Sequence, residues 1–290
     1  MLTTSQQIVV VGAAGWLGSA ICRAIAERGQ PLRGILRPGG PRWHIEDLSM
    51  TLRALPSPED GRGWREALAD CGAIVIADAD LPFLLETERS TAVHRLRSIL
   101  IAAKDVGCPV LLISHALTCA TPSETVPPQG WSEDSRYIPG TARWEPAELL
   151  FAREAELYRF VAAGLHAVIL NPTALSGPGD VHRTQELLSS PDQDHLISTA
   201  DVRDIARTIP HALLHGRSGR RYLLGTEPRP ASSHSRALPH GVPGSWWETP
   251  VDARRARHEL GFRPRPHTQS RADEERWARQ VGFILERCSS

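Results

Sequence analysis

The feature that most constrains the fold is a glycine-spaced loop between a strand-like run and a helical pattern. The apolar run IVVV (8–11) leads into GAAGWLG, in which Gly12, Gly15 and Gly18 recur at every third position. In a strand–loop–helix unit the first glycine permits a tight turn, the second lets backbone N–H groups approach a pyrophosphate, and the third lets the helix pack on the strand. The loop therefore predicts a dinucleotide site, although a tight turn without a ligand would use the same glycines. We expect the contacts to come from Gly12, Ala14, Gly15, Trp16, Leu17 and Gly18.

Apolar runs alternate with longer helical patterns through the first two-thirds of the chain. Strands are expected at 8–12, 32–37, 73–77, 110–114, 167–172 and 220–225, and helices at 19–28, 63–70, about 86–106 and about 145–163. This alternation is typical of βαβ units on a parallel sheet. We predict an α/β fold with a Rossmann-type doubly wound parallel sheet. Residues 1–175, with 200–225 returning to them, would form this core, and 176–199 and 226–290 a small substrate-binding region.

The choice between the two dinucleotide cofactors depends on the end of the second predicted strand. An NAD-specific site usually holds an Asp or Glu there, which binds the ribose hydroxyls. This chain has Arg37, whose guanidinium can bind a 2′-phosphate and stack on adenine, with Arg33 and Arg42 as possible helpers. A solvated arginine at a strand end is the alternative. We expect NADPH rather than NADH as the cofactor.

Charge and cysteine content narrow the class of protein. The chain has 33 basic and 33 acidic residues, so neither nucleic acid nor a membrane surface is an expected partner. Its five cysteines show no paired spacing, which favours reduced thiols over a disulfide framework or a zinc site, and we expect no metal. No leader-like segment or membrane-length apolar run is present, so we expect a cytoplasmic protein.

The glycine spacing, with AAGWLG, resembles the extended and atypical short-chain dehydrogenase/reductases, the epimerase/dehydratase group. The resemblance continues in NPTALSGPGD, in ADVRDIARTIPHALLHGRSGRRYLLG and in DARRARHELGFRPRP, in the family's order. It implies that Pro172 and Thr173 contact the nicotinamide. It also implies that the small residues at and just after the end of the strand at 73–77, Ala77 and Ala79, line the cofactor. Ala54 stands where the family often has Asp, so the backbone of Leu55 is the expected contact to adenine.

The family's chemistry uses a Tyr-x-x-x-Lys pair with a Ser or Thr, and this chain lacks the pair. One helical turn would set the phenol beside the ammonium, which lowers the phenol pKa and holds the ribose. The only lysine, Lys104, follows Leu100 by four residues, and no tyrosine precedes a lysine. Alignment on Glu156 puts Glu148 and Ala152 at the two positions.

Two weaker catalytic candidates follow the strand at 110–114. Ser114 either hydrogen-bonds a substrate carbonyl, next to the nicotinamide, or caps the strand end. His115 either donates a proton near neutral pH or is an ordinary loop histidine, and Thr118 lies farther along.

The region after GPGD is short, with 19 residues between Asp180 and Ala200, which disfavours a nucleotide-sugar substrate. Trp131, Trp144, Trp246 and Trp247 either form core contacts or suit a flat aromatic ligand. We expect an NADPH-dependent ketoreductase of a polycyclic aromatic (angucyclinone-type) ketone in antibiotic biosynthesis. A hydroxyl peri to the carbonyl would replace the missing acid. The alternatives are a non-catalytic NADP sensor and a sugar epimerase or dehydratase. The sequence indicates no oligomeric state.

Overall fold

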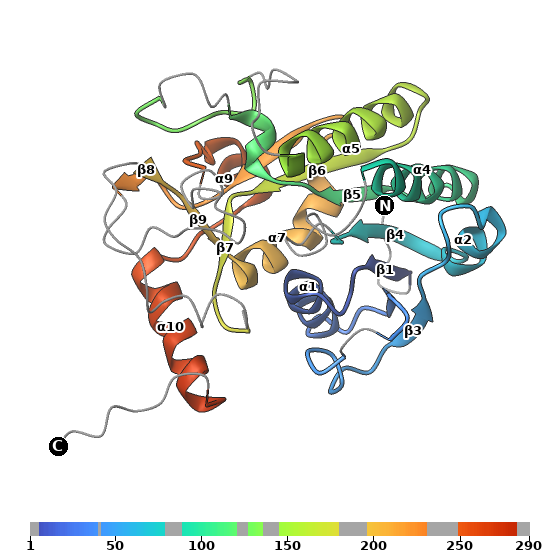
Figure 1. The fold of residues 1–290 in the computed structure, drawn as a ribbon, viewed down its shortest axis with the longest axis horizontal. Coiled ribbons are helices and arrows are strands. Elements are labelled where there is room, and N and C mark those ends of the chain that lie inside the picture. The colour runs from blue at the N-terminus through green and yellow to red at the C-terminus, as the bar shows by residue number, and fades with distance from the viewer. Residues whose placement is uncertain are drawn as a thin grey trace.

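A computed structural model of the protein describes residues 6–39, 42–78, 89–120, 127–135, 145–179, 196–230 and 249–282. Seven strands form its central sheet in the order β10-β6-β5-β4-β1-β2-β3, and every neighbouring pair is parallel (Figure 1). Their bounds are β1 Gln7–Val11, β2 Leu32–Leu36, β3 Thr51–Ala54, β4 Cys71–Ile76, β5 Val110–Ile113, β6 Ala167–Pro172 and β10 Arg221–Leu224.

Helices cover both faces of this sheet. One face carries α1 (Trp16–Ala26) and α7 (Val202–His215), which pack on each other. The other carries α2 (Gly61–Ala67), α4 (Arg89–Val106) and α5 (Glu145–Ala162). Strand β1 sends Ile8 and Val10 to the first face and Val9 and Val11 to the second, because side chains alternate along a strand. A strand buried on both sides is therefore continuously apolar.

Smaller elements extend from the ends of β6 and β10. Two pairs of short strands form there, β7 (Ala174–Ser176) with β9 (Thr199–Asp201) and β8 (Leu196–Ile197) with β11 (Arg229–Pro230). Figure 1 shows β7, β8 and β9 on the left with α10 (His267–Gln280), far from β3. Helix α9 (Arg254–Leu260) packs on α7 and β10, so part of the C-terminal segment covers the core. The described residues also include the 3-10 turn η1 (Ala116–Cys119).

The predicted fold class is confirmed: the sheet is parallel, doubly wound and of the Rossmann type. The expectation of reduced thiols is wrong for one pair. Cys71, which begins β4, forms a disulfide with Cys108, two residues before β5, and their Cα atoms lie 6.6 Å apart. These two strands are neighbours, which brings cysteines 37 residues apart in sequence together. No helix in the described ranges is long and apolar enough to cross a membrane.

Candidate cofactor and active site

The glycine loop has the geometry that its spacing predicted. Gly12 has φ +83°, and a Cβ on it would lie 2.6 Å from the Ala77 carbonyl oxygen. A Cβ on Gly18 would lie 2.0 Å from the Gly12 carbonyl oxygen. Both positions therefore exclude a side chain, which lets strand, loop and helix approach closely.

The same loop ends at a helix terminus suited to an anion. Gly15 is the N-cap of α1; no side chain caps it, and no acidic residue lies in the first turn. The first N–H groups of a helix lack partners within the helix and carry partial positive charge. This cradle fits the pyrophosphate of a dinucleotide, which its N–H groups would bind. Ala14 and Leu17 pack into the core below it.

Trp16 connects the loop to a distant segment. Its Nε1–H donates to the Pro178 carbonyl oxygen over 2.8 Å, and a Cβ on Gly179 would lie 3.1 Å from its ring. The segment that follows β7 thus lies against the first turn of α1. Thr173, at the end of β6, is fully buried, and its hydroxyl lies within hydrogen-bond distance of the Ser198 and Thr249 carbonyl oxygens. Pro172 is the last, buried residue of β6.

The adenine side of the site is built from β2 and β3. Arg37 lies just past the end of β2 and is exposed. Arg33 is no helper, because its Nη1 donates to the carbonyl oxygens of Ala67 and Ala69 at the end of α2. The Leu55 N–H donates to the Leu36 carbonyl oxygen over 2.7 Å, so this N–H is not available to adenine.

A buried carboxyl group lies behind the predicted Ser114. Glu154 of α5 is 2% exposed, and its Oε1 accepts a hydrogen bond from the Ser114 hydroxyl over 2.5 Å. The same oxygen accepts from Thr118 Oγ1 over 2.8 Å and from Asn171 Nδ2 over 2.7 Å. The network joins α5 to β5, η1 and β6 and fixes the Ser114 hydroxyl at the carboxyl end of β5.

Burial raises the pKa of the Glu154 carboxyl, opposed by the Ser114 hydrogen bond, by the charge of Arg221 and by the other two donors. The Arg221 guanidinium lies 3.8 Å from Glu154 Oε2. Sequence reasoning missed this residue. A glutamate on the apolar face of α5, between the buried Leu150 and Leu157, was the signal that could have found it.

The structure shifts the alignment of α5 by two residues. Glu156, on which the sequence alignment rested, makes ion pairs with Arg97 and Arg159, whereas Glu154 faces the sheet. If the family motif is aligned on Glu154 instead of Glu156, its tyrosine and lysine positions fall on Pro146 and Leu150 instead of Glu148 and Ala152. Neither of these residues can donate a proton, so the missing Tyr–Lys chemistry does not depend on the alignment.

His115 is buried rather than on an open loop. Its Nδ1 accepts a hydrogen bond from the Leu117 N–H over 3.1 Å, and burial lowers the imidazole pKa to about 3. The ring is neutral near pH 7, which corrects the idea of His115 as a charged proton donor.

Charged side chains gather beside the end of β4. Asp78 follows Ala77 and pairs with Arg153 of α5, whose side chain is 2% exposed. Burial lowers the pKa of nearby Arg95, and the charges of Arg153 and Arg37 lower it further against the opposing effect of Asp78. The charges of Asp78, Arg153 and Arg37 therefore all act on Arg95 at this end of the sheet. Ala79, a predicted cofactor contact, lies outside the described residues.

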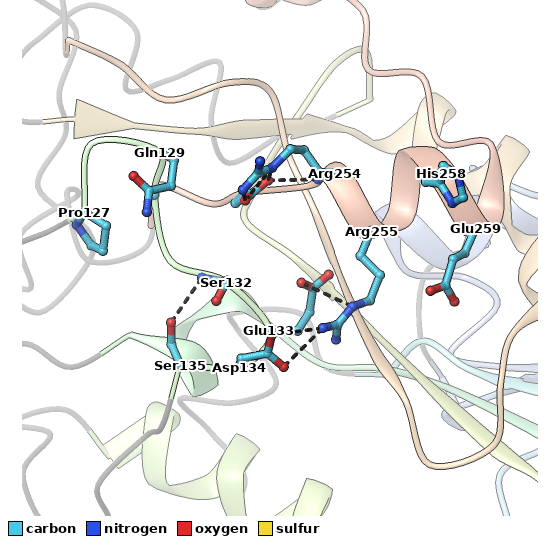
Figure 2. Close-up of a pocket in the computed structure, with 12 residues that line it drawn as sticks. Pro127, Gln129, Ser132, Glu133, Asp134, Ser135, Arg254, Arg255, His258 and Glu259 are labelled. Atoms are coloured by element: carbon cyan, nitrogen blue, oxygen red, sulfur yellow. Dashed lines mark hydrogen bonds and ion pairs between the residues drawn. The ribbon is translucent and has the colours of Figure 1, made fainter.

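A polar groove of about 570 Å³ lies elsewhere, between residues 127–135 and α9 (Figure 2). Arg255 pairs with Asp134 in it, and Arg254 pairs with Asp252. The Leu223 N–H of β10 donates to Glu133 on its wall, and β10 is four strands from β1, so this groove is not the dinucleotide cradle. Of the four tryptophans considered above, only Trp131 is among the described residues, and it is buried. No cluster of potential metal ligands occurs in the part of the chain that the structure describes.

Fold and cradle together define a dinucleotide-binding α/β protein, and comparison specifies the family. A model of the NAD dependent epimerase/dehydratase family matches residues 8–225 of the 290. The chain belongs to this family of NAD(P)-dependent enzymes, as the resemblance implied. Comparison with curated protein sequences gives no significant match.

Solved structures share the fold over nearly the whole chain. The structure of gox2253 has 22% identity and a TM-score of 0.82, covering 97% of this chain and 100% of its own. PA4631, a nucleoside-diphosphate-sugar epimerase from Pseudomonas aeruginosa, has 19% identity and a TM-score of 0.79, with 97% and 99% covered. Vestitone reductase from alfalfa (Medicago sativa) has 15% identity and a TM-score of 0.75, with 97% and 100% covered. Because epimerases and a reductase both occur, the fold does not select the reaction.

Proposed function

We propose that this protein is an NADPH-dependent ketoreductase that reduces a carbonyl of a polycyclic aromatic, angucyclinone-type polyketide in antibiotic biosynthesis. One observation carries the proposal. The Ser114 hydroxyl is held at the carboxyl end of β5 by buried Glu154, in a chain without a Tyr-x-x-x-Lys pair. A fixed hydroxyl can orient a carbonyl, but nothing described beside it is a phenol of lowered pKa.

The choice of NADPH is supported by Arg37. Its exposed guanidinium lies just past the end of β2, where the ribose of the adenine half is expected, and charge-assisted hydrogen bonds to a phosphate are strong. The family as a whole is described as NAD dependent.

Because the protein lacks the Tyr–Lys acid, we infer that the substrate carries its own hydrogen-bond donor. A hydroxyl peri to the carbonyl forms an internal hydrogen bond, which polarises the C=O group and stabilises the alkoxide that develops on oxygen. The nicotinamide, when bound, supplies the hydride. The protein's residues then orient the ketone and exclude water. Ser114 offers a second hydrogen bond when Glu154, whose pKa is raised by burial, is protonated, because the Glu154 O–H then donates to Ser114 Oγ and leaves the serine proton for the ketone oxygen. This pattern resembles the angucyclinone ketoreductase of the simocyclinone pathway, an atypical member of the same family.

The decisive experiment compares two ketones with purified protein and NADPH, following nicotinamide absorbance. One is a polycyclic quinone-type ketone with a free peri-hydroxyl, and the other is its peri-methyl ether. We expect the first to be reduced and the second to react at least about a hundredfold more slowly, since loss of one oxyanion donor costs about 10²–10³ in rate. Equal rates for the two ketones would refute the proposal that the peri-hydroxyl stabilises the developing alkoxide.

The same assay tests the main alternative, a cofactor-binding sensor. The absent Tyr–Lys pair fits a sensor equally well, because neither residue is needed to hold a fold. If the protein binds NADPH tightly but oxidises none of it in the presence of any such ketone, the sensor is favoured over the reductase. Interconversion of a nucleotide sugar would favour the epimerase or dehydratase.

A further inference from the structure

One ion pair beside the glycine loop, between a buried arginine and a partly buried aspartate, has no role in the proposed chemistry. Arg153 of α5 donates from Nη2 to Asp78 Oδ1, and its side chain is 2% exposed. Its Nε and Nη1 are buried and have no hydrogen-bond partner among the described residues. Buried N–H donors are nearly always bonded in folded proteins, so these donors indicate a missing acceptor.

The position of the pair along the sheet edge identifies the part of the cofactor that it faces. A Cβ on Gly12 would lie 3.0 Å from the Asp78 Cα, so the pair adjoins the cradle. The residue after Arg153, Glu154, bonds Ser114 at the end of β5, which places Arg153 on the β4–β5 side of the loop. The strand order β5-β4-β1-β2 sets Arg37 on the other side. A dinucleotide lies across the carboxyl ends of these strands, with its adenine half at β2.

We propose that Arg153 and Asp78 together bind the ribose of the nicotinamide half of the cofactor. The two neighbouring hydroxyl groups of this ribose can provide acceptors for Arg153 and a donor for Asp78. Their oxygens accept from the free guanidinium N–H groups, and one O–H donates to the carboxylate. A neutral diol can both accept from Arg153 and donate to Asp78, whereas an ionised phosphate oxygen has no proton to donate to that carboxylate.

Helix geometry explains how an arginine reaches this point. Leu150 lies four residues before Glu154, at the position that the family spacing gives to lysine, and Arg153 lies one turn after Leu150 on the same face. Side chains on a helix lean toward its N-terminus, so a long residue one turn later can bring its charge to the same place. The Arg153 guanidinium thus takes the place of the family's lysine ammonium, from a residue one turn farther along the helix.

The test uses cofactor fragments and needs no turnover. NADP⁺ and 2′-phospho-ADP-ribose contain the ribose in question, whereas adenosine 2′,5′-bisphosphate does not. Their dissociation constants would be measured by calorimetry for the native protein, for Arg153→Met and for the double variant Arg153→Met/Asp78→Asn. Arg159→Met, on the same helix but 74% exposed, is the control, and thermal unfolding checks that each variant is folded. The series NAD⁺, ADP-ribose and ADP is run in parallel.

We expect Arg153→Met to weaken the two ribose-containing ligands by about 10- to 100-fold and the shorter one by less than about twofold, as for loss of charged hydrogen bonds. The double variant, which leaves no partly buried carboxylate without the Arg153 guanidinium, should show the same pattern in a folded protein. Equal weakening of all three ligands, or no weakening, would overturn the assignment. The inference rests on the dinucleotide-binding part of the proposed function and not on the ketone. If the protein reduces no ketone but the fragment affinities change as expected, the reductase proposal is refuted and the ribose assignment stands. If the protein binds neither NADP⁺ nor NAD⁺, both proposals are refuted.

Discussion

Replacement of Glu154 tests whether the network behind Ser114 organises the site. Glu154→Leu removes the acceptor shared by Ser114, Thr118 and Asn171, and it also removes a desolvated carboxyl. Thr118 Oγ1 and Asn171 Nδ2 each keep the His115 carbonyl oxygen as a partner, whereas no other partner is described for the Ser114 hydroxyl. The variant therefore leaves the Ser114 hydroxyl without an acceptor and removes one acceptor each from Thr118 and Asn171. We expect the free energy of unfolding to fall by about 3–5 kcal/mol. Glu154→Gln keeps an oxygen acceptor and should cost about 1 kcal/mol.

The assay is urea unfolding followed by tryptophan fluorescence, without cofactor. A Leu variant within about 1 kcal/mol of the native protein would refute the energetic role of the network, and so would a Gln variant as damaged as the Leu variant.

The pH dependence of the same comparison has a definite sign. Burial raises the pKa of Glu154 in the folded protein, so its carboxyl binds a proton more tightly there than in the unfolded chain. Its contribution to stability is fully present below the unfolded value of about 4.3 and is lost as pH rises through the folded pKa. The native protein should therefore lose stability relative to Glu154→Gln as pH rises from about 4 through this raised pKa. A native advantage that grows with pH would contradict the raised pKa.

Three further predictions concern the cofactor and the hydroxyl. Ser114→Ala should lower turnover by less than about a hundredfold, because the substrate provides most of the oxyanion stabilisation; complete loss of turnover with unchanged NADPH affinity would point to an acid on the protein. Arg37→Ala should weaken NADPH by about 1.5–3 kcal/mol and leave NADH unchanged, measured by titration, whereas equal weakening would reverse the cofactor assignment. Gly18→Ala should lose about 1–3 kcal/mol of stability and bind dinucleotide poorly in calorimetry, since its Cβ would lie 2.0 Å from a carbonyl oxygen. Gly61→Ala, with nothing within 4 Å of the added Cβ, is its control, and equal damage by both would refute this reason.

The sequence predicted those features that depend on neighbours along the chain. Glycine spacing predicted the loop, which connects β1 to α1 in the structure, and continuous apolar runs predicted the buried strands, which form the sheet. Strand β3 has no such run, because all four of its residues are exposed at the edge of the sheet.

Contacts between distant residues were not predictable in this way. Asp78 and Arg153 are 75 residues apart, and Ser114 and Glu154 are 40 apart. Their meeting depends on the strand order and on the rotation of α5, which periodicity does not specify. The adjacent charges of Arg153 and Glu154 on a helix face otherwise lined by leucines were the available signal, since buried charges often mark sites of chemistry.

The contact between Trp16 and Pro178 also gives the protein an optical probe of its own. The indole lies in the first turn of α1, where the pyrophosphate is expected, and its N–H is held by the segment after β7. A reduced nicotinamide nearby absorbs light in the range in which tryptophan emits, so excitation energy can pass from indole to cofactor. Titration of the native protein and of Trp16→Phe would isolate this residue's share of the signal. Occupancy of the cradle could then be followed in real time for any substrate, including one that is never reduced.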